Sequence, residues 1–349
     1  MNFFDYAGVI HFHSAFSFDG RDSIPEILKA AIDNELDFLM LTDHDHLAAR
    51  DAGFEDWHGN TLLIVGQEIT PSQYNHYIAF DIRDPVSGAG CIPQQVIDQV
   101  RSQGGFGFIA HPDHEGTKMF HVKPFPWKDW TVAGYTGIGI WDFMTDWQSS
   151  LLGCIRAVLS YYAPAFFLKG PRDVTLRRWD NLNREGRIVG IAELDNHHTK
   201  KTLFGKTLHI FPFRKAFRFL RTHVLTEQPF ERNFQEDEQT LFKALKQGRV
   251  YIALEFFENA KGFSFIIESG KETATMGDEL RWTPKAKLQV ALPRRAQVRI
   301  IKDGVLFRDA DAYEIDCPIR EPGVYRIESS LKTFGKYRPW IFSNPVFLR

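Results

Sequence analysis

The chain has 349 residues, of which 44% are apolar and 25% are charged, and this balance is typical of a soluble globular enzyme. A net charge of −2 gives no indication of general nucleic-acid binding. The three cysteines are far apart in the sequence, which excludes a disulfide framework and a zinc site held by cysteines. The start of the chain does not resemble a signal peptide, and no apolar run reaches the ~18–20 residues of a membrane span. We therefore expect a cytoplasmic protein without a membrane partner.

Short apolar runs alternate with helical patterns over the first two thirds of the chain. The runs predict strands of a parallel sheet covered on both faces: Val9–His13, Phe38–Thr42, Thr61–Gly66, Phe106–Ala110, Gly137–Phe143 and Arg187–Ala192. Helices are predicted at Ser23–Glu35, Pro93–Gln103, Asp173–Arg184 and Glu236–Gly248, and a further strand at Val250–Phe256. Such an alternation indicates an α/β barrel or an open sheet.

The pattern changes after about Phe257, where short segments of alternating polarity begin. They predict strands at Gly262–Glu268, Lys287–Ala291, Gln297–Phe307, Ala312–Asp316, Gly323–Ser329 and Trp340–Leu348. Asp303-Gly304, which lies between two apolar runs, is a typical hairpin turn. The sequence thus predicts two domains, an α/β domain at 1–257 and an antiparallel β-sandwich at 258–349 that packs against it.

Histidines and carboxylates follow the predicted strands directly. His11 and His13 end the first strand at positions i and i+2, which point to the same face. The other strand ends carry a similar set: Asp43 and His44, Glu68 with His76, His111, and Asp195 with His197. Because the carboxyl ends of barrel strands form the active face, five strand ends are expected to direct metal-type ligands into one space.

These motifs resemble those of the polymerase and histidinol phosphatase (PHP) family. The resemblance lies in His11-Phe12-His13-Ser14 with Ser17-Phe18-Asp19-Gly20, in Thr42-Asp43-His44-Asp45, in Ala110-His111-Pro112 and in Asp195-Asn196-His197. The motifs occur in family order over about residues 7–255. The ending Arg338–Pro345 is similar to that of the carbaryl-hydrolase-like branch, which appends a β domain.

The resemblance implies a distorted (β/α)7 TIM-like barrel that holds two or three divalent ions. Carried onto this chain, it assigns His11, His13, Glu68 and Asp195 to a first ion, Glu68, His76 and His111 to a second, and Asp19, His44 and His197 to a third. Asp19 stands where many relatives have histidine, so the third site is richer in oxygen. Asp43 is expected to orient a ligand histidine.

Other side chains near these motifs have weaker signals. The spacing from Asp195 favours His197 over His198 as a ligand, and Glu193 is expected to pack or to support a ligand. Surface roles are expected for the remaining loop histidines, His46, His114 and His121. Several cations could attract an anionic substrate but are more often simply solvated: Lys118, Lys123, Lys200, Lys201 and Arg214.

The ligand set predicts hydrolysis of a phosphate ester of a small molecule. Two close ions sharing Glu68 would lower the pKa of a bridging water, and Asp195 and His197 would also take part in catalysis. Zinc, manganese and iron all suit imidazole and carboxylate ligands. Two alternatives stay open: hydrolysis of a carboxylic or carbamic ester or amide on the same ions, and a non-catalytic metal-binding interaction module.

Overall fold

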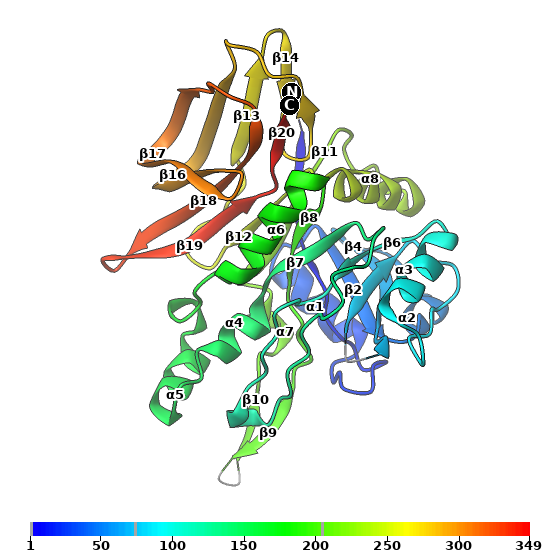
Figure 1. The fold of residues 1–349 in the computed structure, drawn as a ribbon. Helices are drawn as coiled ribbons and strands as arrows, with labels where there is room; N and C mark the ends of the chain where they lie inside the picture. The colour runs from blue at the N-terminus through cyan, green and yellow to red at the C-terminus, as the bar shows by residue number, and fades with distance from the viewer. Residues whose placement is uncertain (1–2, 73–74, 204–205) are drawn as a thin grey trace. The chain divides into compact units, whose positions relative to one another are not determined.

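The structure is a computed structural model and describes residues 3–72, 75–203 and 206–349 (Figure 1). Contacts divide the chain into two units. The N-terminal unit comprises Ala7–Leu168 and Ala192–Arg221, and the C-terminal unit comprises Met1–Tyr6, Lys169–Ile191 and Thr222–Arg349. Neither unit is continuous in sequence. The predicted α/β class is confirmed, whereas the domain boundary at residue 257 and the (β/α)7 barrel stay predictions.

Buried strands form the sheet of the N-terminal unit. The strands that belong to it wholly or in part are β1 (Phe4–Ile10), β2 (Phe38–His44), β3 (Asp56–His58), β4 (Thr61–Ile69), β5 (Tyr77–Phe80), β6 (Phe106–Ile109), β7 (Gly137–Asp142) and β8 (Val189–Glu193). β1, β2 and β4 pair in parallel, as do β6 and β7. β5 is antiparallel to both β4 and β6, so the sheet is mixed and not wholly parallel as predicted. The sequence interpretation did not include β3 and β5.

Helices lie between these strands, and two of them, at Ile24–Asp33 and Pro93–Ser102, are close to where they were predicted, whereas the others were not predicted. Those of the N-terminal unit are α1 (Ile24–Asp33), α2 (Ala48–Asp51), α3 (Pro93–Ser102), α4 (Phe143–Ser149), α5 (Cys154–Tyr162) and α7 (Phe213–Ala216), and a β-hairpin is formed by β9 (Lys200–Leu203) and β10 (Lys206–His209). α1 begins where expected because the Glu26 carboxylate accepts a 2.9 Å hydrogen bond from the Ser23 backbone N–H. In the described part of the chain, no helix is long and apolar enough to cross a membrane.

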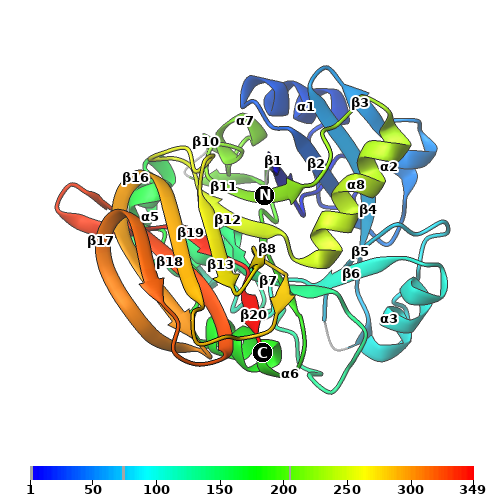
Figure 2. The ribbon, with the colours of Figure 1, turned by 90° about the horizontal axis from the view of Figure 1, so that it is seen from above.

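The C-terminal unit is mainly an antiparallel sheet. Its elements are α6 (Asp173–Glu185), β11 (Leu220–Thr226, shared with the N-terminal unit), α8 (Phe234–Gln247), β12 (Val250–Leu254), β13 (Ser264–Ser269), β14 (Glu272–Ala274), β15 (Glu279–Leu280), β16 (Lys287–Lys302), β17 (Val305–Pro318), β18 (Gly323–Thr333), β19 (Lys336–Ser343) and β20 (Val346–Leu348). Figure 2 shows β16, β17 and β18 as one curved sheet. β16 and β17 pair antiparallel, and β18 pairs antiparallel with β16 and with β19.

The strand boundaries in this unit differ from the predicted ones in several places, and the predicted strand Gln297–Phe307 is divided between β16 and β17. β16 joins two predicted strands because it continues through a bulge between Ala291 and Ala296. The predicted strand Trp340–Leu348 is instead split between β19 and β20. The hairpin at Asp303-Gly304 is confirmed, with φ of 51° and 79°, the left-handed conformation that a tight hairpin turn requires. The sandwich arrangement stays a prediction.

Candidate metal centre

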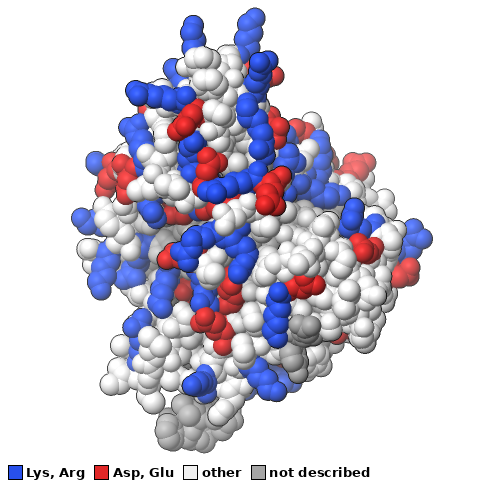
Figure 3. Space-filling view, in the orientation of Figure 1, with Lys and Arg blue, Asp and Glu red and all other residues white. Residues whose placement is uncertain are grey.

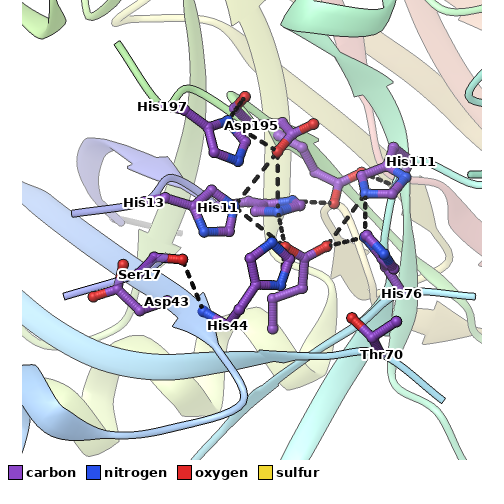
Figure 4. Close-up of polar contacts among 12 residues, drawn as sticks. His11, His13, Ser17, Asp43, His44, Thr70, His76, His111, Asp195 and His197 are labelled. Carbon is purple, nitrogen blue, oxygen red and sulfur yellow. Dashed lines mark hydrogen bonds and ion pairs between the residues drawn. The ribbon is translucent and has the colours of Figure 1, made fainter. Parts of the chain in front are cut away.

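Glu68, at the end of β4, is the centre of a cluster of histidines and carboxylates (Figure 4). Its side chain is 1% exposed, and each carboxylate oxygen faces a different group of histidines. Oε2 lies 3.2 Å from Nε2 of both His11 and His13. Oε1 lies 2.5 Å from Nδ1 of His76 and 3.3 Å from Nε2 of His111. One carboxylate therefore links two sets of nitrogen donors.

The first and second ligand sets expected from the sequence come together around this carboxylate. His11, His13, Glu68 and Asp195 offer ligand atoms that all lie within 4.8 Å of one another, and so do Glu68, His76 and His111. Asp195 completes the first set, since its Oδ1 lies 3.5 Å from Nε2 of each of the first two histidines. Both sets have the nitrogen and oxygen donors that zinc, manganese or iron accept.

The third set also comes together, around the Asp19 carboxylate. Asp19 Oδ2 lies 3.3 Å from His44 Nε2 and 3.1 Å from His197 Nε2, and His13 is close enough to join the group. Ser17 orients this carboxylate by donating its hydroxyl to Oδ1 at 2.7 Å. Asp19 is more exposed than Glu68, at 30% against 1% of the side chain. The third set is thus nearer the solvent than the first two.

The backbone that presents these ligands differs from the strand geometry assumed in the sequence analysis. β1 ends at Ile10 and β8 ends at Glu193, so the ligand motifs that follow them lie beyond the strands, joined only by an isolated bridge between Phe12 and Asn196. The strand assignment was wrong at these residues, although His11 and His13 do face one site. His11, His111 and Asp195 instead have positive φ values of 66°, 28° and 48°. Such conformations are costly for residues with side chains and concentrate at functional sites. Here each one redirects the chain as it leaves a strand.

Glu193 supports two of the ligand histidines from behind. Its Oε1 lies 2.9 Å from His11 Nδ1, and its Oε2 accepts a 2.7 Å hydrogen bond from the His111 backbone N–H. Gly139 on β7 makes room for it, because a Cβ at that position would lie 1.4 Å from Glu193 Oε2. The carboxylate therefore fixes the tautomer of His11 so that Nε2 carries the lone pair directed at Glu68 and Asp195.

Asp43 does not orient a ligand histidine as expected. Its two oxygens accept hydrogen bonds from Ser14, one from the backbone N–H at 2.7 Å and one from the hydroxyl at 2.6 Å. Asp43 is buried and Ser14 directly follows His13. The carboxylate therefore holds the loop after β1, and the expectation was wrong because Asp43 contacts Ser14 and not the ring of a ligand histidine.

Neighbouring groups of opposite charge determine which side chains of the cluster are protonated. Burial alone would raise the pKa of Glu68, but His76, His11 and His44 keep it well below its ordinary range. Burial would lower the pKa of His44 and His111, but nearby carboxylates, Glu68 among them, raise both to about 9. Without ions, the centre thus holds protons on nitrogens that a metal would otherwise occupy.

Several buried nitrogens of the cluster have no hydrogen-bond partner, and this tests whether divalent ions fit. The atoms concerned are His11 Nε2, both ring nitrogens of His13, His44 Nδ1 and His111 Nδ1. Buried polar atoms are rarely left unpaired in folded proteins. Imidazole nitrogens close to carboxylates, with unused lone pairs, are the donors that a divalent transition metal takes. The residues therefore fit the ions that the sequence predicts.

A cavity of about 480 Å³ lies over the cluster and is open to solvent. Its floor includes Glu68, His76, His111, Asp195 and His197. Its walls are largely apolar and aromatic: Phe18, Phe120, Val122, Phe125, Met144, Trp147 and Ile210. Arg21 and Gln148 are polar lining residues that the sequence analysis missed, since neither stands at a strand end. The cations suggested from the sequence are not among the described lining residues.

The other histidines near the motifs have contacts of their own. His198 lies 2.6 Å from Asp22 Oδ1 and 2.8 Å from His209 Nδ1, outside the ligand sets. His46 contacts the Phe16 carbonyl, consistent with the surface role expected. His114 was also expected at the surface, but it is buried and lines the cavity. Burial and the neighbouring His111 lower its pKa to about 4, so the ring is neutral at neutral pH.

Residues 10–100 match the family model of the PHP domain. This range includes His11, His13, Asp19, Glu68 and His76, while His111 and Asp195 lie beyond it. No curated protein matches the chain. The resemblance to PHP domains that the motifs indicated is therefore confirmed over residues 10–100, and the carbaryl-hydrolase-like branch stays a prediction.

Solved structures with similar folds share little sequence with this chain. A two-domain protein from Bacteroides vulgatus, containing a predicted PHP-like metal-dependent phosphoesterase, is 15% identical with a TM-score of 0.47, and the match covers 98% of this chain and 95% of that one. A proposed metal-dependent phosphoesterase from Bifidobacterium adolescentis is 16% identical with a TM-score of 0.39, covering 58% and 92%. The lesion-specific endonuclease Q from Pyrococcus furiosus is 11% identical with a TM-score of 0.42, covering 70% and 56%.

Endonuclease Q has also been solved in complex with a 27-mer duplex substrate. The sequence expectation for the present chain is that it binds no nucleic acid. It stays a prediction that the net charge alone suggests.

Proposed function

We propose that this protein is a metal-dependent phosphoesterase that hydrolyses a phosphate ester of a small molecule in the cavity above Glu68. The observation that carries the proposal is the Glu68 carboxylate, whose two oxygens face separate sets of histidines at 2.5–3.3 Å. The PHP match over residues 10–100 supports the same chemistry. We include the (β/α)7 barrel and two or three ions of zinc, manganese or iron in the proposal.

The residues of the site would have different roles in this reaction. His11, His13, Glu68 and Asp195 would hold one ion, Glu68, His76 and His111 a second, and Asp19, His44 and His197 a third. Bound divalent ions would supply an activated water and offset the negative charge of the phosphate. Arg21 on the cavity wall would bind a phosphate oxygen.

His114 would act as a neutral hydrogen-bond donor at the edge of this site. The Phe125 backbone N–H donates to His114 Nδ1 at 3.1 Å, which leaves the ring proton on Nε2. Because its pKa is lowered to about 4, the ring stays neutral and adds no positive charge near the ions. Its N–H could bind an oxygen of the substrate without changing the charge of the site.

One observation favours the acyl alternative as a second candidate. The walls of the cavity carry Phe18, Phe120, Phe125 and Trp147, and Arg21 is the only Lys or Arg among its described lining residues. An apolar wall suits an aryl or alkyl group of either ester class, so it does not require a highly charged substrate. The same ions could direct water to the carbonyl carbon of a carboxylic or carbamic ester.

The experiment that tests the proposal is a substrate screen of protein purified without chelator. Elemental analysis should find at least two transition-metal ions per chain, and model phosphate monoesters or diesters should be hydrolysed. Activity on a carboxylic ester far above that on every phosphate ester would establish the second candidate. Fewer than one ion per chain, with no increase in bound metal on adding zinc or manganese, would show that the protein is not a metal-dependent hydrolase. Metal binding without any hydrolysis would favour an interaction module.

A further inference from the structure

The outer face of α5 is apolar and exposed to solvent. Ile155 and Tyr162 are 80% and 73% exposed, and Val158 and Leu159 between them are each 54% exposed. Leu152, just before the helix, is 70% exposed. Their spacing of three or four residues places them on one side of the helix. Large exposed apolar side chains gathered on one face usually mark a contact with another surface.

Two sequence segments of this part of the N-terminal unit contain no acidic residues, although Asp33 and Asp22 from outside them pair with Arg214 and His198. Residues 147–168 and 196–221 contain no Asp or Glu but eight Lys or Arg, whereas the whole chain has 44 acidic residues among 349. About six acidic residues would be expected in these segments at the average frequency. In Figure 3 the area where Figure 1 places α5 shows Lys and Arg side chains among uncharged ones. The apolar face thus belongs to a basic region.

Contacts join these two segments into one surface. The Tyr161 hydroxyl donates to the His209 carbonyl at 2.9 Å, and Lys215 Nζ donates to the Tyr161 carbonyl at 2.5 Å. Lys215 also lies over the Tyr161 ring, 4.8 Å from its centre. These contacts use the inner side of α5, so its apolar outer face stays exposed while the basic segment is held beside it.

We propose that α5, with the basic segment beside it, docks on a lipid surface that carries anionic headgroups. A short helix with an apolar face and basic surroundings can insert that face among acyl chains while its cations contact the headgroups. The aliphatic side chains of Leu152, Ile155, Val158 and Leu159 cannot stack on bases, which disfavours a nucleic acid. A second copy would bring two basic regions together, and like charges disfavour that contact.

The docking helix adjoins the wall of the cavity. The Trp147 indole N–H donates to the Ser160 carbonyl of α5 at 3.2 Å, and Trp147 lines the cavity. Phe120, another lining residue, stacks on the Trp147 ring with centres 6.0 Å apart. Docking through α5 would therefore hold one wall of the cavity beside the lipid surface. The proposal does not depend on which ester the protein hydrolyses.

Vesicle sedimentation of the full-length protein tests this proposal. The wild type should sediment with phosphatidylcholine vesicles that contain phosphatidylserine, and less with phosphatidylcholine alone or at high salt. The double variant Ile155→Ser/Leu159→Ser, and separately Tyr162→Ser, should bind these vesicles at least about tenfold more weakly. Val305→Ser, a control at a 66% exposed position of β17, should bind as the wild type does.

Three outcomes would overturn the proposal. The first is wild-type protein that sediments no more with anionic vesicles than without them. The second is unchanged binding in both α5 variants, with their folds confirmed by circular dichroism. The third is a dimer of the wild type that the α5 variants dissociate, measured by analytical ultracentrifugation, since that would assign the face to a second copy. Esterase activity on a soluble substrate, measured in parallel, keeps this test separate from that of the proposed function.

Discussion

Two buried histidine clusters in this protein differ in how their ring nitrogens are paired. In the C-terminal unit, His223 has both nitrogens on carboxylates, Nδ1 on Asp5 at 2.8 Å and Nε2 on Glu255 at 3.0 Å. Burial would lower the pKa of His223, but these two carboxylates raise it. In the N-terminal unit, His13 is equally buried, but Nδ1 has no partner, and Nε2 lies 3.2 Å from Glu68 Oε2 without forming a hydrogen bond.

The difference separates a structural cluster from a binding site. The contacts of His223 satisfy the ring, and the Tyr251 hydroxyl adds a 2.6 Å hydrogen bond to Asp5, so this cluster needs nothing further. The Glu68 cluster instead gathers several unpaired nitrogens around a carboxylate, an arrangement that stays costly until a cation is bound. Burial of histidine and carboxylate together therefore does not identify a metal site, whereas unpaired nitrogens do.

The variant Glu68→Gln should have the largest effect on function. The amide has nearly the same shape but no charge, so it can no longer link the two sets of histidines through two anionic oxygens. We expect loss of bound metal and a decrease in kcat/KM on the order of 10³-fold or more. Glu255→Gln is the matched control, because Glu255 is also buried against a histidine, and it should keep its metal. Equal loss of metal in Glu68→Gln and Glu255→Gln would show that the two histidine clusters do not differ in metal binding.

The variant His223→Ala should have the largest effect on stability. It leaves Asp5 and Glu255 without their shared imidazolium, and removing one partner from a buried charge cluster costs about 3–5 kcal/mol of unfolding free energy. Urea unfolding measures this loss, and elemental analysis should find unchanged metal content. A loss below about 1 kcal/mol would show that His223 is not the structural centre of its cluster.

The sequence predicted the site residues better than the geometry that presents them. All nine candidate ligands come together, because they lie at strand ends or in the loops beside them, and such strand ends meet. The left-handed conformations of His11, His111 and Asp195 could not be predicted, since they depend on contacts with distant segments. The roles of Glu193 and Asp43 were misjudged or left open because residue spacing does not show which atom a carboxylate contacts.

The elements of the fold that were predicted and those that were missed differ in whether the local sequence determines them. Long periodic segments such as α1, α3 and α8 have strong local patterns, so their positions were predicted closely. β5 has four residues and no pattern of its own, and its antiparallel pairing with β4 and β6 depends on residues far away in sequence. The two discontinuous units are likewise set by long-range contacts that no local pattern reports.

The variant Glu193→Gln should weaken metal binding without abolishing it. Glu193 contacts His11 Nδ1 and the His111 backbone but no other candidate ligand in the described contacts, so its loss should disturb ligand orientation only. Such supporting residues contribute about 10–100-fold in metal affinity. Gly139→Ala should have a similar effect, because its Cβ would displace Glu193. Gly186→Ala, where a Cβ would contact nothing within 4 Å, is the control. Wild-type affinity in both test variants would contradict the role of Glu193.

Metal affinity should also depend on pH, because the ions displace protons from the cluster. His44 and His111 have pKa values raised to about 9 in the metal-free cluster, and both must lose a proton to bind metal. Affinity should therefore rise as pH increases from about 7 to 9, by roughly tenfold per pH unit for each proton released, and then level off. Chelator competition measures the affinity, and an indicator dye measures the released protons.

The same pKa values predict how metal removal changes stability. Because folding raises the pKa of both histidines above the ordinary 6.5, protonation stabilises the metal-free protein fully below about pH 6.5. That contribution is lost as pH rises through about 9, where the neutral rings no longer offset the charge of Glu68. The Tm of chelator-treated protein should thus fall between pH 6.5 and 9, while the Tm of metal-loaded protein should fall less. Parallel curves for the two forms would show that His44 and His111 are not where the metal replaces protons.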